Sequence, residues 1–227
     1  MLIFSPSDYY AIILSAKVAV SATLLTLPFG FLLAYLVTFL SFRGKTVLEV
    51  LINLPLTLPP VVIGYFLLLL LGRNGLLGGL LEAAGIRIIF TWKAAVIASA
   101  VVGFPLLVRS IRIGMESIDR QMIQVSRSLG ACWHDTLVTV IMPLSMRGII
   151  AGSSLMFARS LGEFGATIIV AGNIPGVTQT IPLAIYDYAG SPGNEQVALS
   201  LCIVSVVLSL IVLILHEVAG RKLAGSG

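Results

Sequence analysis

The residues with the clearest chemical potential are two opposite charges inside an apolar stretch. Arg159 and Glu163 stand four positions apart within residues 148–171, a run otherwise rich in apolar and small residues. Side chains four apart share one face of a helix and can form an ion pair. Charges at membrane depth are costly and usually face a helix bundle or a water path. The pair is therefore either a gate beside a translocation path or a static pair that holds two helices together.

The residue types that enzymes use for covalent chemistry are sparse in this chain. The two histidines are His134 and His216, the two cysteines are Cys132 and Cys202, and Ser153 lacks the G-x-S-x-G setting of a nucleophilic serine. The cysteines indicate neither a disulfide framework nor a metal site. We therefore predict no catalytic residue, no metal and no cofactor, and an intramembrane enzyme is disfavoured.

The composition is that of a membrane protein. Of 227 residues, 58% are hydrophobic and 11% are charged, with a mean hydropathy of +1.06. One bilayer crossing takes about 20 apolar residues. Residues 1–227 are therefore predicted to form a single all-α integral membrane domain, with no room for a second, soluble one. The net charge of +4 is attributed to loop orientation rather than to nucleic-acid binding. Because the first basic residue is Lys17, we expect no removable signal peptide.

About five stretches are apolar enough to cross a membrane, and they define a core from about residue 9 to residue 218. These stretches are residues 9–40, 47–71, 92–108, 148–171 and 197–218. A short interfacial helix is expected near residues 76–84. In the fourth stretch, Ala158, Gly162 and Ala166 would form a ridge of small residues that lets another helix approach closely.

Prolines interrupt the second apolar stretch. Pro55, Pro59 and Pro60 all fall within residues 47–71. Proline lacks an amide donor and kinks a helix, and in lipid the freed carbonyls must find other partners. The break at Pro59 and Pro60 therefore either lines a water path or merely bends the helix around a neighbour.

Basic residues are unevenly divided between the two sides of the predicted bundle. If the turn after the first span is cytoplasmic, that side holds Arg43, Lys45, Arg109, Arg112, Arg120, Arg127, Arg147, Arg221 and Lys222. The other side holds only Arg73, Arg87 and Lys93. Because basic loops stay inside, we predict that the N-terminus lies outside and the C-terminus lies in the cytoplasm.

The long loop between the third and fourth spans is amphipathic. Residues 115–129 are predicted to form a helix, supported by i,i+4 pairs of Glu116 with Arg112 and Arg120. Gly130 suits the left-handed conformation that ends a helix, and a second short helix should end near Pro143. This coupling loop, about residues 114–143, would be a knob projecting from the bundle; the alternatives are a solvated loop or an interfacial helix lying on lipid.

One run in this loop resembles the EAA signature of ABC importer permeases. The run is Gln124-Val125-Ser126-Arg127-Ser128-Leu129-Gly130, then nine residues, then Val140-Ile141-Met142-Pro143. The signature reads E-A-A, three residues, Gly, nine residues and I-x-L-P, so Gly and Pro match in spacing while Gln, Val, Ser, Val and Met replace Glu, Ala, Ala, Ile and Leu. The resemblance implies a coupling helix that docks in a cleft of a separate ATPase subunit. The contact residues that it implies are Gln124, Val125, Ser126, Ser128, Leu129, Gly130, Ala131 and Pro143.

Further segments resemble the molybdate ABC transporter permease family. They are residues 58–65 (LPPVVIGY), 72–75 (GRNG), 104–106 (FPL), 158–167 (ARSLGEFGAT), and 173–176 (NIPG) with 180–182 (TIP). Sulfate and tungstate permeases share parts of these motifs, so these oxyanions are the alternatives to molybdate. On this resemblance Pro59, Pro60, Arg159 and Glu163 would lie near the translocation path or gate.

The resemblance also implies the partners. They are two copies of an ABC ATPase subunit, an extracytoplasmic oxyanion-binding protein, a second copy of this chain and the lipid of a bacterial cytoplasmic membrane. The chain has no G-x-x-x-x-G-K-[ST] run to cradle a phosphate, so ATP would be hydrolysed on the partner. The loop of residues 172–196 would either dock the binding protein or be a plain connection. The rival is a secondary transporter or channel that acts alone.

Overall fold

The computed structural model describes residues 4–224, and all of the regular structure in that range is helical. Three helices are long and apolar enough to cross a membrane: α1 (Pro6–Phe39), α5 (Trp92–Glu116) and the portion Glu195–Val218 of α12 (Glu195–Ala224). The count rises to five if each of two bent helix pairs is one span. The predicted all-α membrane fold is confirmed. Side chains beyond Val218 are not described, so Arg221 and Lys222 lie outside the described side chains.

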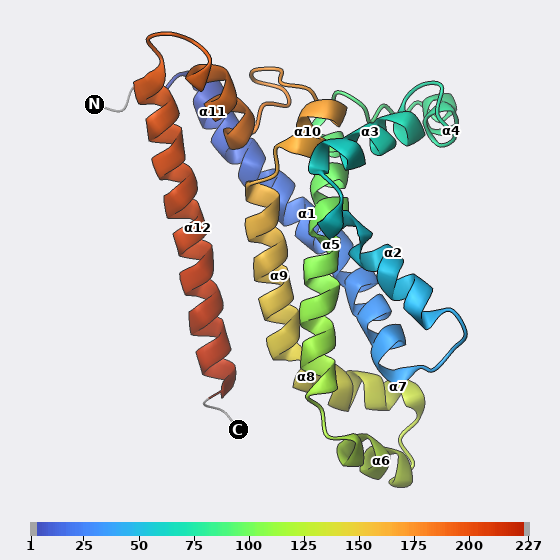
Figure 1. The fold of residues 1–227 in the computed structure, drawn as a ribbon. Coiled ribbons are helices and arrows are strands. Elements are labelled where there is room, and N and C mark those ends of the chain that lie inside the picture. The colour runs from blue at the N-terminus through green and yellow to red at the C-terminus, as the bar shows by residue number, and fades with distance from the viewer. Residues whose placement is uncertain (1–3, 225–227) are drawn as a thin grey trace.

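The centre of the bundle is formed by α1, α5 and α9 (Met146–Leu161), which pack against one another (Figure 1). Glycines bring α5 and α9 together: a Cβ on Gly148 would stand 2.8 Å from the Ser110 carbonyl oxygen and 2.9 Å from the Gly114 Cα. The Ser110 hydroxyl also donates to the Gly148 carbonyl at 3.2 Å. Such contacts are typical of membrane helices, where small residues allow close packing.

The second predicted span is two helices. α2 (Lys45–Thr57) and α3 (Pro60–Leu71) meet at Pro59 at an angle of 112°. Residues 47–71 therefore do not form one continuous helix, because two consecutive prolines cannot continue the hydrogen-bond ladder of α2. Pro55 by contrast lies inside α2. Figure 1 shows α3 turning away from α2 toward the short helix α4 (Gly78–Ala83), which confirms the expected helix near residues 76–84.

The fourth predicted span is also broken. α9 ends at Leu161, and α10 (Gly165–Val170) begins after an interruption at residues 162–164. The predicted ridge of Ala158, Gly162 and Ala166 is therefore wrong as a continuous helix face. Instead α10 packs against α3: a Cβ on Gly64 would lie 2.8 Å from the Ala166 carbonyl oxygen, and one on Gly165 would lie 3.0 Å from the Pro60 Cβ. The break between α2 and α3 is therefore in contact with the break between α9 and α10.

The third span is longer than predicted. α5 runs to Glu116 rather than ending near Val108, because its last turns bury Ile111 and Met115 completely. The amphipathic helix expected over residues 115–129 is correspondingly shorter, and forms α6 (Arg120–Ser128). Three pieces connect α6 to α9: α7 (Trp133–Thr136), the π-helical segment η1 (Leu137–Ile141) and α8 (Met142–Leu144).

The loop predicted over residues 172–196 contains a helix, α11 (Ile181–Ala189). Its buried residues Ile181 and Ala184 pack with Ala11 of α1 and Leu201 of α12. The buried Ser15 hydroxyl accepts a hydrogen bond from the Ile181 amide at 2.8 Å, which satisfies the first amide of this helix. The loop is thus largely a packed element that joins α1 to α12.

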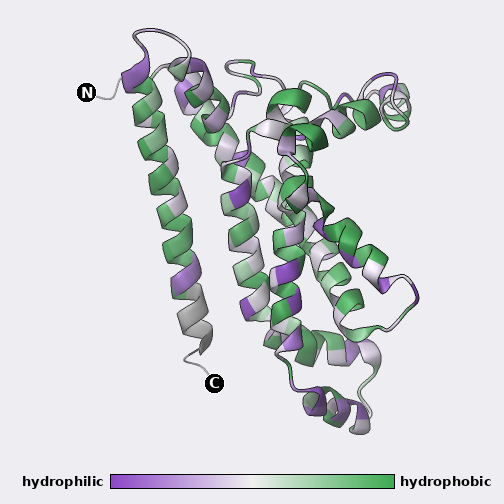
Figure 2. Ribbon diagram, viewed as in Figure 1, coloured by the Kyte–Doolittle hydropathy of each residue, from purple (hydrophilic) through white to green (hydrophobic). Residues whose placement is uncertain are grey.

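Hydropathy divides the molecule along its length (Figure 2). The long helices are mainly apolar, whereas α6 is mainly hydrophilic and projects beyond the ends of α5 and α9. A polar helix at one end of an apolar bundle belongs in water or at a partner. The fold therefore positions two features of interest, which are the projecting segment and the crossing of the broken spans.

Candidate functional site

The projecting segment comprises residues 117–145, which join α5 to α9, and is called here the coupling segment. Its first helix, α6, is capped by Asp119, whose carboxylate accepts a hydrogen bond from the Gln121 amide at 2.9 Å. No residue of α6 is buried. Ile123 packs half-buried against the core, and most of the other residues of α6 are exposed, so most of the surface of this helix is available to another protein.

Gly130 ends this helix in the left-handed conformation, with φ of +89°. Leu129 beside it is 83% exposed and Val125 is 57% exposed. The prediction that Gly130 caps the helix is confirmed. Leu129 and Val125 thus present apolar side chains on an otherwise polar helix, where a partner could cover them.

The coupling segment is tied back to the bundle. The Ser126 hydroxyl lies 3.2 Å from the hydroxyl of buried Thr136, and the Trp133 ring packs against Tyr35 of α1, tilted by 50° with 5.4 Å between the ring centroids. The Arg127 guanidinium stands 5.6 Å from the Trp133 ring, within reach of a cation–π contact. These contacts connect α6 to α7, and α7 to α1.

A capping box at Cys132 begins α7, from which the chain leads back to the bundle. The Cys132 thiol donates to Asp135 Oδ2 at 3.0 Å, and this hydrogen bond lowers the pKa of the Asp135 carboxyl below its ordinary value. The π-helical turn that follows leads to Pro143. Since Pro143 has no amide, it cannot close an α-helical turn, and the Met142 amide instead bonds to the Leu137 carbonyl five residues back.

All the residues predicted to contact an ATPase lie in the coupling segment. Those that are exposed are Gln124, Val125, Ser128, Leu129, Gly130 and Pro143. Ser126 and Ala131 are half-buried, and Ser126 holds the segment together through Thr136. The structure thus leaves most of the predicted set available for contact, while their role in coupling stays a prediction.

The intramembrane ion pair forms across the end of α9. Arg159 Nη1 lies 2.7 Å from Glu163 Oε2, and the Glu163 side chain is 1% exposed. Its other oxygen, Oε1, accepts a hydrogen bond from the Ala166 amide at 2.8 Å, which caps α10. Glu163 therefore serves two purposes at the break, since it neutralises Arg159 and satisfies an amide of the next helix.

The four residues predicted near the gate are brought into one region. Gly165 follows the Arg159–Glu163 pair by two residues and sits against Pro60, which itself follows Pro59 at the break between α2 and α3. On the other side of the break, the Phe164 ring lies 5.2 Å from that of Tyr186 in α11. The break thus contacts both α3 and α11.

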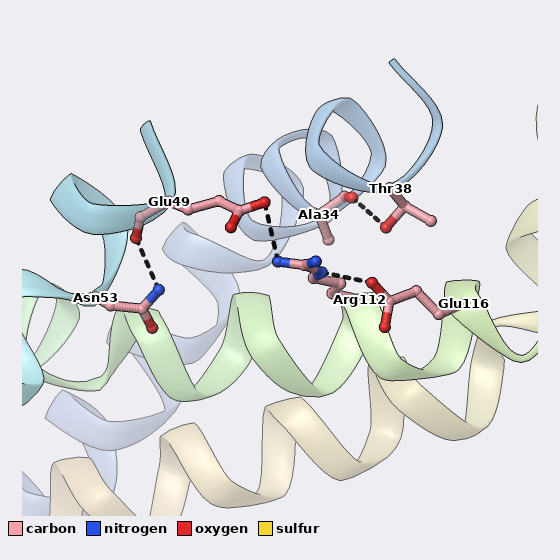
Figure 3. Close-up of polar contacts among 6 residues, drawn as sticks. All are labelled: Ala34, Thr38, Glu49, Asn53, Arg112 and Glu116. Carbon is pink, nitrogen blue, oxygen red and sulfur yellow. Dashed lines mark hydrogen bonds and ion pairs between the residues drawn. The ribbon is translucent and has the colours of Figure 1, made fainter. Parts of the chain in front are cut away.

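Two charged contacts are additional to those predicted from the sequence. Lys17, a charge inside the first span, places its Nζ 3.9 Å from the centre of the Trp92 ring. Glu49 of α2 pairs with Arg112 of α5 at 3.2 Å (Figure 3), in addition to the predicted Arg112–Glu116 pair at 2.6 Å. Glu49 is an acidic residue inside a predicted span, and because such residues usually have a partner, its position in the sequence could have indicated this contact.

The architecture defines a class of protein. The chain is similar in fold to a chain from the crystal structure of a bacterial alginate ABC transporter in complex with alginate pentasaccharide-bound periplasmic protein, with a TM-score of 0.77, 16% identity, and coverage of 97% of this chain and 81% of that chain. At this identity the likeness shows the fold alone, which is that of an ABC transporter membrane component.

The family follows from the sequence comparisons. The family model described as "Binding-protein-dependent transport system inner membrane component" matches residues 26–225, and the chain belongs to this family. It is 46% identical over 221 residues to the molybdenum transport system permease protein ModB of Escherichia coli K12, covering 97% of this chain and 96% of that protein. It is 48% identical over 214 residues to ModB of Haemophilus influenzae, covering 94% and 93%. The chain is a transport component and not an enzyme.

Replacing Glu163 with Gln tests the ion pair. The amide oxygen can still accept from Ala166, so the change removes mainly the charge and leaves Arg159 unpaired. We expect the free energy of unfolding to fall by about 2 kcal/mol, less than for a fully buried pair because the Arg159 side chain is 30% exposed. Thermal melting in detergent measures the loss.

The matched control is Glu82→Gln, which removes the exposed Arg73–Glu82 pair at 3.2 Å. Exposed pairs contribute about 0–1 kcal/mol, so this variant should melt close to the wild type. Equal melting temperatures for all three proteins would contradict a structural contribution of the Arg159–Glu163 pair.

Proposed function

We propose that this chain is the permease subunit of an ATP-driven importer for a tetrahedral oxyanion, most favourably molybdate. The observation that carries the proposal is the coupling segment, a capped, unburied helix with Leu129 exposed at its tip, in a chain 46% identical to a molybdenum transport permease. The high similarity along nearly the whole chain supports transfer of the substrate class. Tungstate and sulfate are the alternatives within the family.

The coupling segment would transmit the closure of a separate ATPase. Two ATPase subunits that bind ATP would move toward each other, and each would push on α6 through Val125 and Leu129. Trp133 would pass this displacement to Tyr35 of α1, and Ser126 would pass it to the buried Thr136 of α7, from which the chain continues into α9. Because α5 and α9 are locked by glycine contacts, they would move as one body.

The membrane part would form a path between two copies of this chain. Closed two-fold dimers are the commonest oligomers, and paired ATPases each require a coupling helix. The interruptions at Pro59 and at residues 162–164 separate α3 from α2 and α10 from α9, so they are the places where the chain can bend. The Arg159–Glu163 pair lies at one of them, either as a gate or as a static joint.

An extracytoplasmic binding protein would dock at the opposite end, on α11 and its flanking turns. Tyr186 of α11 is 62% exposed, and its ring contacts Phe164, the neighbour of Glu163. Tyr188 holds α11 on α1 by donating to Asp8 at 2.8 Å, and burial raises the pKa of its phenol above the ordinary value. A docked protein would therefore press directly on the break in the fourth span.

Reconstitution with its partners tests the function. Proteoliposomes that contain this chain, the ABC ATPase and the oxyanion-binding protein should accumulate labelled molybdate only when ATP is supplied. Unlabelled tungstate and sulfate, added as competitors, rank the substrates. Uptake driven by an ion gradient without ATP or ATPase would instead identify a secondary transporter.

Labelling of Cys132 tests the orientation, in which the N-terminus lies outside and the coupling segment in the cytoplasm. Cys132 is exposed and Cys202 is the other cysteine of the chain, so a Cys202→Ser variant offers a single site. A membrane-impermeant maleimide should label inverted vesicles and leave right-side-out vesicles unlabelled. Labelling of right-side-out vesicles would place the coupling segment where no ATPase can reach it.

Gly130→Val tests coupling. A Cβ at Gly130 meets no atom within 4 Å, so the strain comes from φ of +89° alone. A β-branched residue cannot adopt this conformation without a cost of about 1–2 kcal/mol, and the turn after α6 should be displaced. We expect normal membrane insertion with ATP hydrolysis no longer coupled to uptake, measured as molybdate transported per ATP hydrolysed.

Gly130→Asn is the matched control, since Asn tolerates the left-handed conformation. This variant should retain most of the coupled uptake. If the Val and Asn variants transport equally well, the geometry of this turn does not matter for coupling.

A further inference from the structure

A polar cavity lies at the end of α5 that leads into the coupling segment. Its volume is about 440 Å³, and it opens between α1, α2 and α5. The apolar lining is interrupted by five polar side chains: Glu49, Asn53, Arg109, Arg112 and Glu116. The cavity is large enough for a small tetrahedral ion that keeps part of its hydration water.

Three of these side chains already interact with one another: the carboxylates of Glu49 and Glu116 both pair with the guanidinium of Arg112. Arg112 donates to Glu116 Oε1 at 2.6 Å from Nε and lies 3.2 Å from Glu49 Oε1 through Nη1 (Figure 3). The Asn53 amide donates to the Glu49 carbonyl at 2.7 Å, within α2. This group joins α2 to α5 and carries one net negative charge, so Arg112 is not available to a passing anion.

Arg109 is different. It stands one turn before Arg112 on the same face of α5, it lines the same cavity, and it is exposed. Among the described residues, no carboxylate lies within ion-pair distance of its guanidinium. It is therefore the cation of this cavity that can pair with an ion from outside the chain, and a guanidinium matches the oxygen geometry of an oxyanion.

We propose that Arg109 is the anion-binding residue of a release site, which a tetrahedral oxyanion contacts as it leaves the translocation path. This proposal rests on the proposed function of the chain as an oxyanion permease. The site lies beside the coupling segment, so an ion held there is close to the aqueous phase on the ATPase side.

The neighbouring charges make this a site of weak binding. The group of Glu49, Arg112 and Glu116 repels a dianion, while Arg109 attracts it, and the four charges cancel across the cavity. A path conducts only if each site binds well enough to admit the ion and weakly enough to release it. A single free arginine facing a net negative group meets both conditions.

The test is molybdate uptake by reconstituted Arg109→Gln complexes. We expect the initial uptake rate to fall about tenfold, the lower end of what local electrostatic attraction contributes to association rates. Arg109→Lys, which keeps the charge, should recover most of the rate. Arg43→Gln is the matched control, because Arg43 is an exposed cation in the turn between α1 and α2 and does not line the cavity.

Salt separates an electrostatic role from a structural one. Raising the sodium chloride concentration should slow uptake by the wild type more than uptake by Arg109→Gln. The ratio of the wild-type rate to the variant rate should therefore fall toward one. Unchanged uptake by Arg109→Gln would overturn the proposal, as would a tenfold loss with no dependence on salt. Loss of the assembled complex on size-exclusion chromatography would overturn it too, because it would make Arg109 an interface residue.

The wild-type measurement keeps the two hypotheses apart. If wild-type complexes accumulate no oxyanion, then the proposed function fails. If they accumulate molybdate with ATP while Arg109→Gln behaves like Arg43→Gln, only the release site fails.

Discussion

The constraint on which this structure depends is that backbone polar groups in a membrane must be satisfied within the protein. Two spans are interrupted, at Pro59–Pro60 and at residues 162–164, and each interruption frees amides and carbonyls. At the first, the Pro59 carbonyl accepts from the Val62 amide at 2.9 Å. At the second, the Glu163 carboxylate accepts from the Ala166 amide, and the Phe164 carbonyl accepts from the Ile168 amide at 2.9 Å. The breaks are stable because nearby groups of the same chain satisfy their backbone amides and carbonyls, and because the two breaks pack against each other.

Local chemistry was predictable from the sequence, and cross-chain contacts were not. Gly130 was identifiable because its left-handed conformation is a property of one residue type, and Arg159 with Glu163 because their spacing is fixed by the helix. The end of α5 was misplaced because Arg109 and Arg112 look like loop residues. The helix continues past them because Ile111 and Met115 are buried, while Arg112 pairs with Glu49 on α2, a residue more than 60 positions away in the chain.

The break before α10 and the helix α11 were missed for a related reason. Residues 148–171 contain no proline, and apart from Arg159 and Glu163 their apolar and small residues predict one span. The interruption is favoured by contacts that only the folded chain provides: Gly165 against Pro60, and Phe164 against Tyr186. Likewise α11 begins at Ile181, where Ser15 of α1 completes its N-terminus. Tertiary partners, rather than propensity, set these ends.

α9 connects the two ends of the molecule. At one end it follows the coupling segment directly, and the bend between residues 133–144 and α9 is 65°. At the other end it stops at Leu161, beside the ion pair and the contact between Phe164 and Tyr186. Between these ends, glycine contacts at Gly148 and Gly152 lock it to α5, with would-be Cβ atoms 2.8 and 2.9 Å from backbone oxygens of α5. A close-packed pair transmits displacement with little compression, so under the proposed coupling a push on α6 would reach the breaks at the far end of α9.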